Sequence, residues 1–390
     1  MMPQSPPPCE AEALEPGDTS TFHQGGMHFG LPPLQEHGPA LSTFEMTRPL
    51  VFYFPLFVYW AFLGLRHWGL SLPTVANPHF PLGGLIGESK SEVLDTITDP
   101  VARSFISPYT TLAMAPEAEL DTLWAGALER VETERLGWPV VAKPDIGSRG
   151  AGVRLAKTPE DLKAYLAAFP RGHTVVLQAF IPFEAEAGVF YVRLPGERQG
   201  RLFSLTLKYF PYVVGDGVST LRTLIERDPR AGRIAHIYLP RHSNHAERVL
   251  PEGQPYRLAF AGSHSRGTIF KDGSAHITPQ MTAAFERVAQ AMPEFYFGRF
   301  DVRFPTIEDL KRGEKFRIIE VNGAGAEATH IWDSGNSLWS AYRTLFEQYG
   351  LLYRIGAANR RRGFKPVPWW QVARSYVKEL TATAHYPQTE

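Results

Sequence analysis

Apolar and charged residues alternate most regularly in the run GRFDVRF, residues 298–304. Because the side chains of a β-strand point alternately to its two faces, this run predicts a strand with one apolar and one charged face. The apolar face carries Phe300, Val302 and Phe304, and the charged face carries Arg299, Asp301 and Arg303. The apolar face is expected to pack on a core.

A second strand is predicted at residues 316–321. The period of two places three side chains of this run on one face: Ile318, Glu320 and Asn322. The connection TIEDLKRGEK (306–315) is charged and contains a single glycine, Gly313. This composition predicts a hairpin loop and therefore an antiparallel pair of strands.

Antiparallel pairing would bring Asp301, Glu320 and Asn322 together, with Arg299 beside them. Two carboxylates and one amide are oxygen ligands that suit a hard cation such as Mg²⁺, and they leave positions free for phosphate oxygens. A solvated strand face with ordinary salt bridges is the alternative interpretation of the same pattern.

Similar patterns predict the other elements. Strands are expected at 139–142, 153–155, 174–182, 188–195 and 201–210, and helices at 88–97, 116–136, 158–169, from 220 onward, at 278–292 and at 337–364, with a last helix ending near 381. Thr158 and Thr278 are expected to cap their helices. Residues 228–280 show little periodicity, so few elements are assigned there.

A lysine and a glycine-rich turn follow each other at residues 143–153. The turn DIGSRGAGV (145–153) joins two predicted strands and lacks the spacing of a P-loop, so no Walker site is expected. Its small residues allow backbone N–H groups to approach phosphates: Gly147, Ser148, Gly150 and Gly152. Lys90, in the first turn of helix 88–97, lies in a second setting that attracts phosphate, although a surface lysine is the alternative.

The run LVFYFPLFVYWAFLGL (50–65) is uncharged, rich in aromatic residues and bracketed by Arg48 and Arg66. A spanning helix needs about 20 apolar residues, so this run is short for one. Three interpretations stay open: a buried helix, an interfacial anchor and a short transmembrane span. A basic, tryptophan-containing stretch at 354–370 is a further candidate for contact with anionic headgroups, against the alternative of a solvated helix end.

Composition and charge narrow the function classes. The 390 residues contain 40 Lys and Arg and 40 Asp and Glu, and this balance gives no support to nucleic-acid binding. The single cysteine, Cys9, excludes an intrachain disulfide and a cysteine-based zinc site, which is typical of a cytoplasmic protein. Residues 1–47 lack periodicity and predict a disordered tail.

Taken in order, these motifs resemble the ATP-grasp superfamily, in particular its carboxylate–amine ligases such as D-alanine–D-alanine ligase and the ATP-grasp parts of cyanophycin and glutathione synthetases. The resemblance covers about residues 75–350 and implies an α/β (α+β) fold of two subdomains that grip a nucleotide, with a shortened N-terminal subdomain. The expected organisation is a tail (1–47), an aromatic segment (48–70), a reduced N-terminal subdomain (71–115), an ATP-grasp domain (116–350) and a C-terminal helical tail (351–390).

The resemblance also implies roles for single residues. The ATP-binding residues would be Lys90, Lys143, Gly147, Ser148, Gly150, Gly152, Gln178, Phe180, Glu186 and Lys208, with Glu184 as a rival of Glu186 for the ribose. Asp301, Glu320 and Asn322 would bind Mg²⁺, or Mn²⁺ in its place, and Arg299 and Lys208 would be catalytic. The acceptor site is expected near Ser263, His264, Ser265, Arg266, Glu327 and His330, with loop packing as the alternative role for the last two.

The implied reaction joins a carboxylate to an amine of amino-acid or peptide-like substrates through an acyl phosphate, and releases ADP and phosphate. Two other functions stay open: a phosphotransferase without an amine acceptor, and a non-catalytic ATP-binding module at a membrane surface. The expected partners are small molecules. Peripheral membrane contact through residues 50–65 and a homodimer both stay open.

Overall fold

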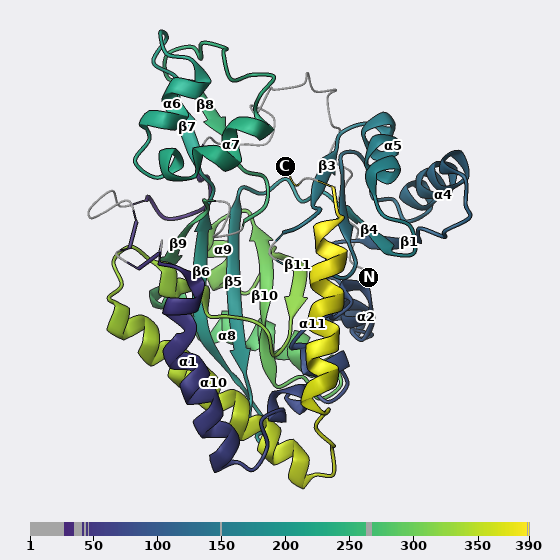
Figure 1. Cartoon of the computed structure of the whole chain (residues 1–390), viewed down its shortest axis with the longest axis vertical. Helices are drawn as coiled ribbons and strands as arrows, with labels where there is room; N and C mark the ends of the chain where they lie inside the picture. The colour runs from purple at the N-terminus through teal and green to yellow at the C-terminus, as the bar shows by residue number, and fades with distance from the viewer. Residues whose placement is uncertain are drawn as a thin grey trace.

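The computed structural model describes residues 27–34, 41–42, 44–45, 47–148, 150–262, 267–387 and 389. Two antiparallel sheets organise these residues, as Figure 1 shows. One has four strands in the order β1-β4-β2-β3, and the other has five strands in the order β11-β10-β5-β6-β9. The predicted mixed α/β (α+β) fold is confirmed.

The four-stranded sheet forms a subdomain with two helices. Its strands are β1 (Tyr109–Ala113), β4 (Thr174–Ala179), β2 (Val140–Pro144) and β3 (Arg154–Ala156), and its helices are α4 (Leu120–Thr133) and α5 (Pro159–Ala168). Apolar residues of both helices and of the sheet form one buried cluster. Thr158 and Asp161 form a capping box that starts α5, as the sequence predicts for Thr158.

The five-stranded sheet forms the centre of the molecule. It consists of β11 (Arg317–Asn322), β10 (Phe297–Phe304), β5 (Ala185–Val192), β6 (Arg201–Tyr209) and β9 (Ile269–Asp272). One face packs against α8 (Pro279–Gln290), and Phe300, Val302 and Phe304 are buried in that core. The predicted apolar face of β10 is therefore confirmed.

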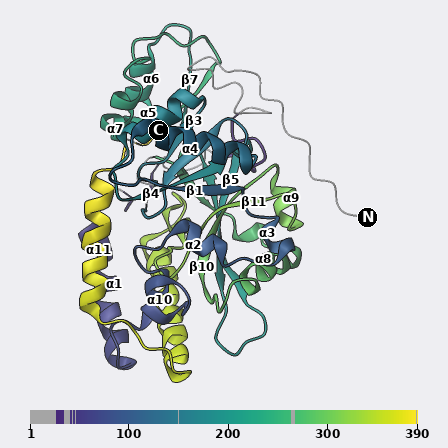
Figure 2. The same ribbon diagram turned by 90° about the vertical axis from the view of Figure 1, so that its right-hand side faces the viewer.

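Three helices lie on the other side of this sheet: α1 (Pro49–Arg66), α10 (Leu338–Arg361) and α11 (Trp369–Ala384). Figure 2 shows α1 and α11 at the left edge of the molecule, with α8 beyond the opposite face of the sheet. Helix α1 packs on α10 through aromatic residues, since Phe52 stacks on Tyr342 with ring centroids 5.5 Å apart.

A small lobe follows β6. It contains a two-stranded sheet of β7 (Tyr212–Val214) and β8 (Pro255–Arg257), with α6 (Leu221–Arg227), η4 (Ala231–Ile234) and α7 (Ala235–Arg241). These elements share their own buried apolar cluster. Most of the lobe lies in the stretch where the sequence pattern assigns few elements.

The N-terminal part is reduced, and its pieces are short: η2 (Leu72–Val75), η3 (Pro81–Gly84), α2 (Lys90–Asp95) and α3 (Pro100–Arg103). The next element, β1, joins the four-stranded sheet through β4.

Some residues of the expected disordered tail make defined contacts. The backbone N–H of Ile307 donates to the carbonyl of Gly30 at 2.7 Å, and the hydroxyl of Tyr209 donates to the carbonyl of Pro32 at 2.8 Å. Glu45 forms a buried ion pair with Arg230. The prediction of disorder is wrong for these residues because their backbone oxygens and one carboxylate have partners on the main body. Residues 1–26, 35–40, 43 and 46 lie outside the described part.

The connection between β10 and β11 also differs from its prediction. Instead of a plain hairpin loop, it contains the short helix α9 (Ile307–Lys311). The side chain of Thr306 accepts a hydrogen bond from the N–H of Asp309 and so caps the start of this helix. The charged composition of the connection did not indicate this cap.

Candidate functional site

A β-bulge organises the pairing of β10 with β11. Arg299 lies opposite Asn322 and Asp301 lies opposite Glu320, but the register then shifts so that Val302 faces Ile318. Ile319 is the extra residue, because an inserted residue leaves one position of the bulged strand without a partner. The expected meeting of Asp301, Glu320 and Asn322 on one antiparallel pair is therefore found.

The bulge corrects one detail of the sequence prediction. An unbroken period of two would place Ile318 on the same face as Glu320 and Asn322. In the structure Ile318 is buried in the core together with α8. The extra residue shifts the alternation of side chains by one position. Ile318 therefore faces the core, while Glu320 faces the site.

Asp301 is the most heavily bonded acidic residue of the site. Its carboxylate accepts hydrogen bonds from Arg299 Nε at 2.8 Å and Nη2 at 3.0 Å, and Lys208 Nζ lies 3.3 Å away. Asn322 Nδ2 is 3.5 Å from the same group. Burial alone would raise the pKa of Asp301, but Arg299 and Lys208 outweigh it and bring the pKa to about 2.

Two further charged residues, Glu186 and Arg303, extend this network across the sheet. Lys208 on β6 lies opposite Glu186 on β5, and its Nζ donates to Glu186 Oε1 at 2.8 Å. Arg303 Nε donates to the other oxygen at 3.2 Å. Burial favours the neutral acid, yet Lys208 and Arg303 lower the pKa of Glu186. The expected ribose ligand is thus held by two cations, and its rival Glu184 is held by Arg257 and Tyr212.

Lys143 connects the two sheets. It lies on β2 of the four-stranded sheet, and its Nζ donates to Ile319 O of β11 at 2.9 Å and to Gln178 Oε1 at 2.8 Å. Burial lowers the pKa of Lys143 to about 8, although Glu320 acts in the opposite direction. Lys143 forms no ion pair with a carboxylate of the described residues, and the two oxygens that accept from its ammonium group are neutral.

Lys90 approaches the same place from α2. Its Nζ donates to Gly147 O at 2.6 Å and lies 3.6 Å from Glu320 Oε1. Asp145 fixes the start of the glycine-rich loop, because its carboxylate accepts from Ser89 Oγ at 2.6 Å and from the N–H of Ser91 at 2.8 Å. The expected lysine pair, Lys90 and Lys143, therefore flanks Glu320.

The glycine-rich loop is the predicted turn between two paired strands. Gly150 and Gly152 have φ values of +69° and +70°, a conformation that residues with a Cβ adopt at a cost. Ser148 lies in the turn and its carbonyl accepts from the N–H of Ala151 at 3.1 Å. Arg149 lies outside the described part.

The C-terminal segment that follows α11 contacts this loop through Tyr386 and Thr389. The hydroxyl of Tyr386 donates to Ile146 O at 2.8 Å, and Thr389 Oγ1 accepts from the N–H of Gly152 at 2.9 Å. Thr389 also donates to Gly150 O at 2.8 Å. The ring of Tyr386 stacks on Phe169 with centroids 5.3 Å apart.

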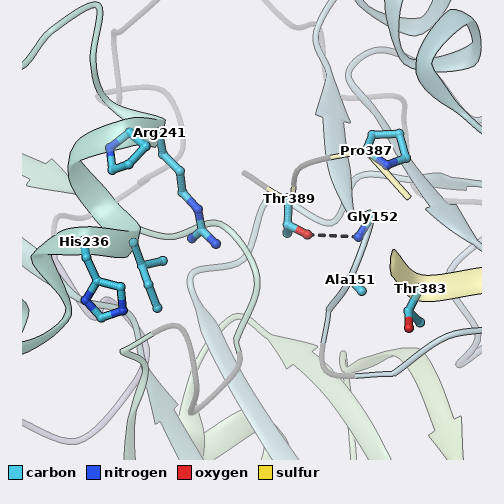
Figure 3. Close-up of a pocket in the computed structure, with 9 residues that line it drawn as sticks. Ala151, Gly152, His236, Arg241, Thr383, Pro387 and Thr389 are labelled. Atoms are coloured by element: carbon cyan, nitrogen blue, oxygen red, sulfur yellow. Dashed lines mark hydrogen bonds between the residues drawn. The ribbon is translucent and has the colours of Figure 1, made fainter. Parts of the chain in front are cut away.

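A cavity of about 370 Å³ lies between the loop, α7 and the C-terminal segment, and Figure 3 shows its lining side chains. It is lined by Ala151, Gly152, His236, Ile237, Pro240, Arg241, Thr383, Pro387 and Thr389. Arg241 extends into it, and its buried Nη1 has no hydrogen-bond partner among the described residues. The charged residues of β10 and β11 do not line this cavity.

Two of the expected ATP-binding residues, Gln178 and Phe180, follow each other closely at the end of β4. Gln178 is buried and its amide is engaged with Lys143 and Ile319 O. Phe180 belongs to a group of rings around Arg303, whose guanidinium carbon lies 5.9 Å from the centre of the Phe180 ring and 5.5 Å from that of Phe260. Apolar rings next to a charged strand provide the kind of surface on which a base can stack.

Of the expected acceptor residues, Glu327 contacts Arg299, and His330 lies near Asp272 and Asp333. Arg299 Nη1 donates to the backbone carbonyl of Glu327 at 3.0 Å, and the Glu327 carboxylate accepts from the Tyr53 hydroxyl at 2.8 Å and from Trp332 Nε1 at 2.9 Å. His330 Nδ1 is buried without a partner among the described residues, and burial lowers the pKa of His330. Ser263, His264, Ser265 and Arg266 lie outside the described part.

The predicted metal ligands lie on one strand pair, where Asp301 is already paired with Arg299 and Lys208. Among the described residues, no group of three or more His, Cys, Asp or Glu side chains is placed to hold a metal ion. Asp301 and Glu320 oppose each other and Asn322 lies beside Asp301, so two carboxylates and an amide share one face. Mg²⁺ is commonly held by one or two carboxylates together with water and phosphate oxygens.

Sequence reasoning missed several residues of the site. Arg303 follows from the same alternation that identifies Arg299 and Asp301, so the pattern itself contained that signal. Gly188 is different: a Cβ there would lie 3.0 Å from Arg299 Cδ and 3.3 Å from Asp301 Oδ1. A glycine on a fully buried strand indicates such a close approach only once the neighbouring strand is known.

Comparison with known proteins gives similarities to solved structures at low sequence identity. No family model and no curated protein matches the chain. Among solved structures, it is similar to D-alanine–D-alanine ligase from Bacillus anthracis, with 13% identity over 70% of this chain and 68% of that chain and a TM-score of 0.38. D-cycloserine synthetase shows 12% identity over 67% of this chain and 69% of that chain, with a TM-score of 0.35.

A bifunctional glutathione synthetase from Pasteurella multocida shows 16% identity over 68% of this chain, with a TM-score of 0.32. The chain spans only 38% of the length of that enzyme. Overlaps this weak leave the activity to be judged from the side chains of the site.

Proposed function

We propose that this protein is an ATP- and Mg²⁺-dependent ligase that joins a carboxylate to an amine through an acyl phosphate. The observation that carries the proposal is the meeting of Lys143 with the Asp301–Glu320 pair. The lysine comes from one sheet and the carboxylates come from the other, and Ile319 O joins them. A cation and paired carboxylates on two sheets are what a triphosphate with its metal ion requires.

In the first step, a carboxylate oxygen of the substrate attacks the γ-phosphorus of ATP. The new O–P bond forms as the bond to the bridging oxygen breaks, and ADP leaves with that electron pair. In this proposal Lys143, Lys90 and N–H groups of the glycine-rich loop stabilise the negative charge on the phosphates. Mg²⁺ held by Asp301, Glu320 and Asn322 would neutralise part of the same charge.

In the second step, the nitrogen of the amine attacks the acyl carbon, the C–O bond to phosphate breaks and one proton leaves the nitrogen. Arg299 is the group proposed to stabilise the oxyanion, because Asp301 holds its guanidinium in a fixed orientation. His330 is proposed to accept the proton. Burial lowers the pKa of His330, so the ring is neutral at pH 7, and its Nδ1 has no partner among the described residues.

Hydroxylamine provides a test that needs no knowledge of the natural amine. The full chain is incubated with ATP, Mg²⁺, hydroxylamine and single members of a panel of amino acids and dipeptides. An acyl phosphate is trapped as a hydroxamate, and equal amounts of ADP and phosphate are released. A phosphorylated product that is stable to hydroxylamine, without free phosphate, would show a kinase instead. Failure to bind ATP by titration calorimetry would overturn both functions.

Substitutions connect any activity to the proposed site. Asp301→Asn and Glu320→Gln are each expected to lower the rate at least about 100-fold, the effect of losing one electrostatic stabiliser. Glu314→Gln is the matched control, since Glu314 is an exposed residue just before the same strand β11. Rates within a few-fold of wild type for both site variants would contradict the proposed site.

A further inference from the structure

Helix α1 leaves an apolar surface uncovered. It buries Phe52, Leu56 and Leu63 and packs against α10. Its outer side carries large exposed apolar residues: Phe54, Phe57, Val58, Phe62 and Leu65. Trp68 follows the helix and is 88% exposed. Soluble monomers rarely leave an apolar patch of this extent uncovered, so the surface calls for a binding partner.

Helix α11 adds a second apolar surface on the same side of the five-stranded sheet, as Figure 2 shows. Its inner side is fixed to the protein, since Glu379 Oε2 accepts from the N–H of Gly87 at 2.9 Å. Its outer side exposes Trp369, Trp370, Tyr376, Val377 and Leu380. Arg374 and Lys378 are exposed between these residues and form no ion pair with described residues. Tryptophan together with Lys and Arg on one helix is typical of segments that lie in a membrane interface.

The charge around these helices is strongly one-sided. Residues 46–87, which contain α1, have no Asp or Glu and two Arg. Residues 348–378 have no Asp or Glu and seven Lys and Arg. The two segments meet, because Arg360 of α10 donates to the backbone carbonyls of His67 and Trp68 at 2.8 and 2.7 Å. In a chain with equal numbers of acidic and basic residues, the acidic residues are absent from these segments.

We propose that α1, Trp68 and α11 form a docking surface for a membrane that contains anionic lipids. The apolar side chains of both helices enter the interface, while Arg361, Lys365, Arg374 and Lys378 contact the headgroups. A second copy of the chain is a poorer partner, because a two-fold contact would place these cations against each other.

The contact is peripheral and does not involve a span. Helix α1 is the one described helix that is long and apolar enough to cross a membrane, with a mean hydropathy of 1.4, but length and composition alone are weak evidence. One side of α1 is held by α10, which exposes Arg343, Glu347 and Arg354. A spanning α1 would have to leave α10 or bring these charges into lipid, which is costly.

Vesicle flotation of the full chain tests the proposal. The protein is expected to float with vesicles of phosphatidylcholine and phosphatidylglycerol and to stay at the bottom with phosphatidylcholine alone. Binding is expected to weaken when salt is raised from about 0.1 M to about 1 M, because the Debye length falls from about 10 Å to about 3 Å. Alkaline carbonate should release the protein, and resistance to carbonate would overturn the peripheral contact.

Variants locate the contact. Arg374→Glu with Lys378→Glu is expected to lower the partition coefficient about tenfold or more, since each basic residue near an anionic surface contributes about 1 kcal/mol. Arg171→Glu with Arg198→Glu changes the net charge equally at exposed positions elsewhere and should bind like wild type. Trp369→Ser with Trp370→Ser should also abolish binding, whereas Val101→Ser with Val218→Ser at other exposed positions should not.

Besides resistance to carbonate, two results would overturn the proposal. One is equal binding of all four double variants, which would place the contact elsewhere. The other is the absence of vesicle binding together with a dimer that dissociates in the Trp369→Ser, Trp370→Ser variant, which would show that a second copy covers the surface. Because none of these residues belongs to the nucleotide site, either result would leave the proposed ligase activity untouched.

Discussion

The ammonium group of Lys143 donates a hydrogen bond to the backbone carbonyl of Ile319 across a distance of 2.9 Å. Ile319 is the bulged residue of β11, and its carbonyl can face the other sheet because the bulge interrupts the β10–β11 ladder. The same irregularity thus turns Glu320 toward the site and provides an acceptor for the lysine. One inserted residue fixes the contact between the two sheets.

The affinity of the protein for ATP should depend on pH through the titration of Lys143. Burial lowers the pKa of Lys143 to about 8, so the side chain is cationic below that pH and neutral above it. ATP affinity of the wild type is expected to weaken as the pH rises above about 8. Titration calorimetry between pH 7 and pH 10 would measure this dependence.

Lys143→Met is the matching variant. It should bind ATP at least about tenfold more weakly at pH 7 and lose the pH dependence. The folded pKa lies below that of an exposed lysine, so wild-type stability from this group rises with pH between about 8 and about 10.5. The melting temperature of the wild type, measured relative to that of the variant, should therefore rise with pH over this range. A dependence of affinity on pH that persists in the variant would contradict the assignment.

Glu186 is expected to matter for stability as much as for binding. Its carboxylate balances Lys208 and Arg303, and all three side chains are at least nine-tenths buried. Glu186→Ala would leave the buried Arg303 without its carboxylate and Lys208 with Asp301 alone, at a cost of about 3–5 kcal/mol in the free energy of unfolding. Urea denaturation measures this value. Glu308→Ala is the control, because its ion pair with Lys311 is exposed and contributes less than about 1 kcal/mol. Similar losses for both variants would refute the prediction.

His330 should control the amine step and leave the first step unchanged. If its neutral ring accepts the proton, amide formation by the wild type falls below its pKa, which burial places lower than the usual 6.5. His330→Gln should lower the rate of amide formation about 100-fold. It should also remove the fall of this rate at low pH, the acidic limb of the pH–rate profile. Carboxylate-dependent ADP release in the presence of hydroxylamine, a nucleophile that is already neutral at pH 7, serves as the internal control. An unchanged acidic limb in the variant would exclude this role.

Tyr386 should determine how firmly the glycine-rich loop is held. Tyr386→Ala removes the stacking on Phe169 and the hydrogen bond to Ile146 O. Limited trypsin digestion, which cleaves after Arg149, is expected to be several-fold faster in this variant, because loop opening governs such cleavage. Tyr376→Ala, at an exposed tyrosine on the preceding helix α11, should be cleaved like the wild type. Equal rates for the two variants would show that the loop does not depend on Tyr386.

The sequence predicted the parts of the fold and of the site that depend on local periodicity. The charged face of β10, the hairpin around the glycine-rich loop, and the caps at Thr158 and Thr278 each follow from a few neighbouring residues. Asp301 and Glu320 could be paired in advance because antiparallel strands close together in the chain have few registers to choose from.

The remaining features depend on contacts between distant segments. The bulge at Ile319 leaves no mark in the alternation of RIIEVN, because its role becomes visible only beside Lys143, which is more than 170 residues away in the chain. The roles of Tyr53, which binds Glu327, and of Glu379, which binds Gly87, are equally remote. In such cases the partner determines the function of a residue, and local pattern contains no information about the partner.

Thr389 binds both Gly150 and Gly152, so the described chain ends against the glycine-rich loop. A polypeptide joined close after Thr389 would therefore begin near the glycine-rich loop of the proposed nucleotide site. An affinity tag placed there would compete with the loop for space. The low activity that results would then be misread as a property of the protein itself. Catalytic assays should therefore be carried out on protein that carries no tag at this end.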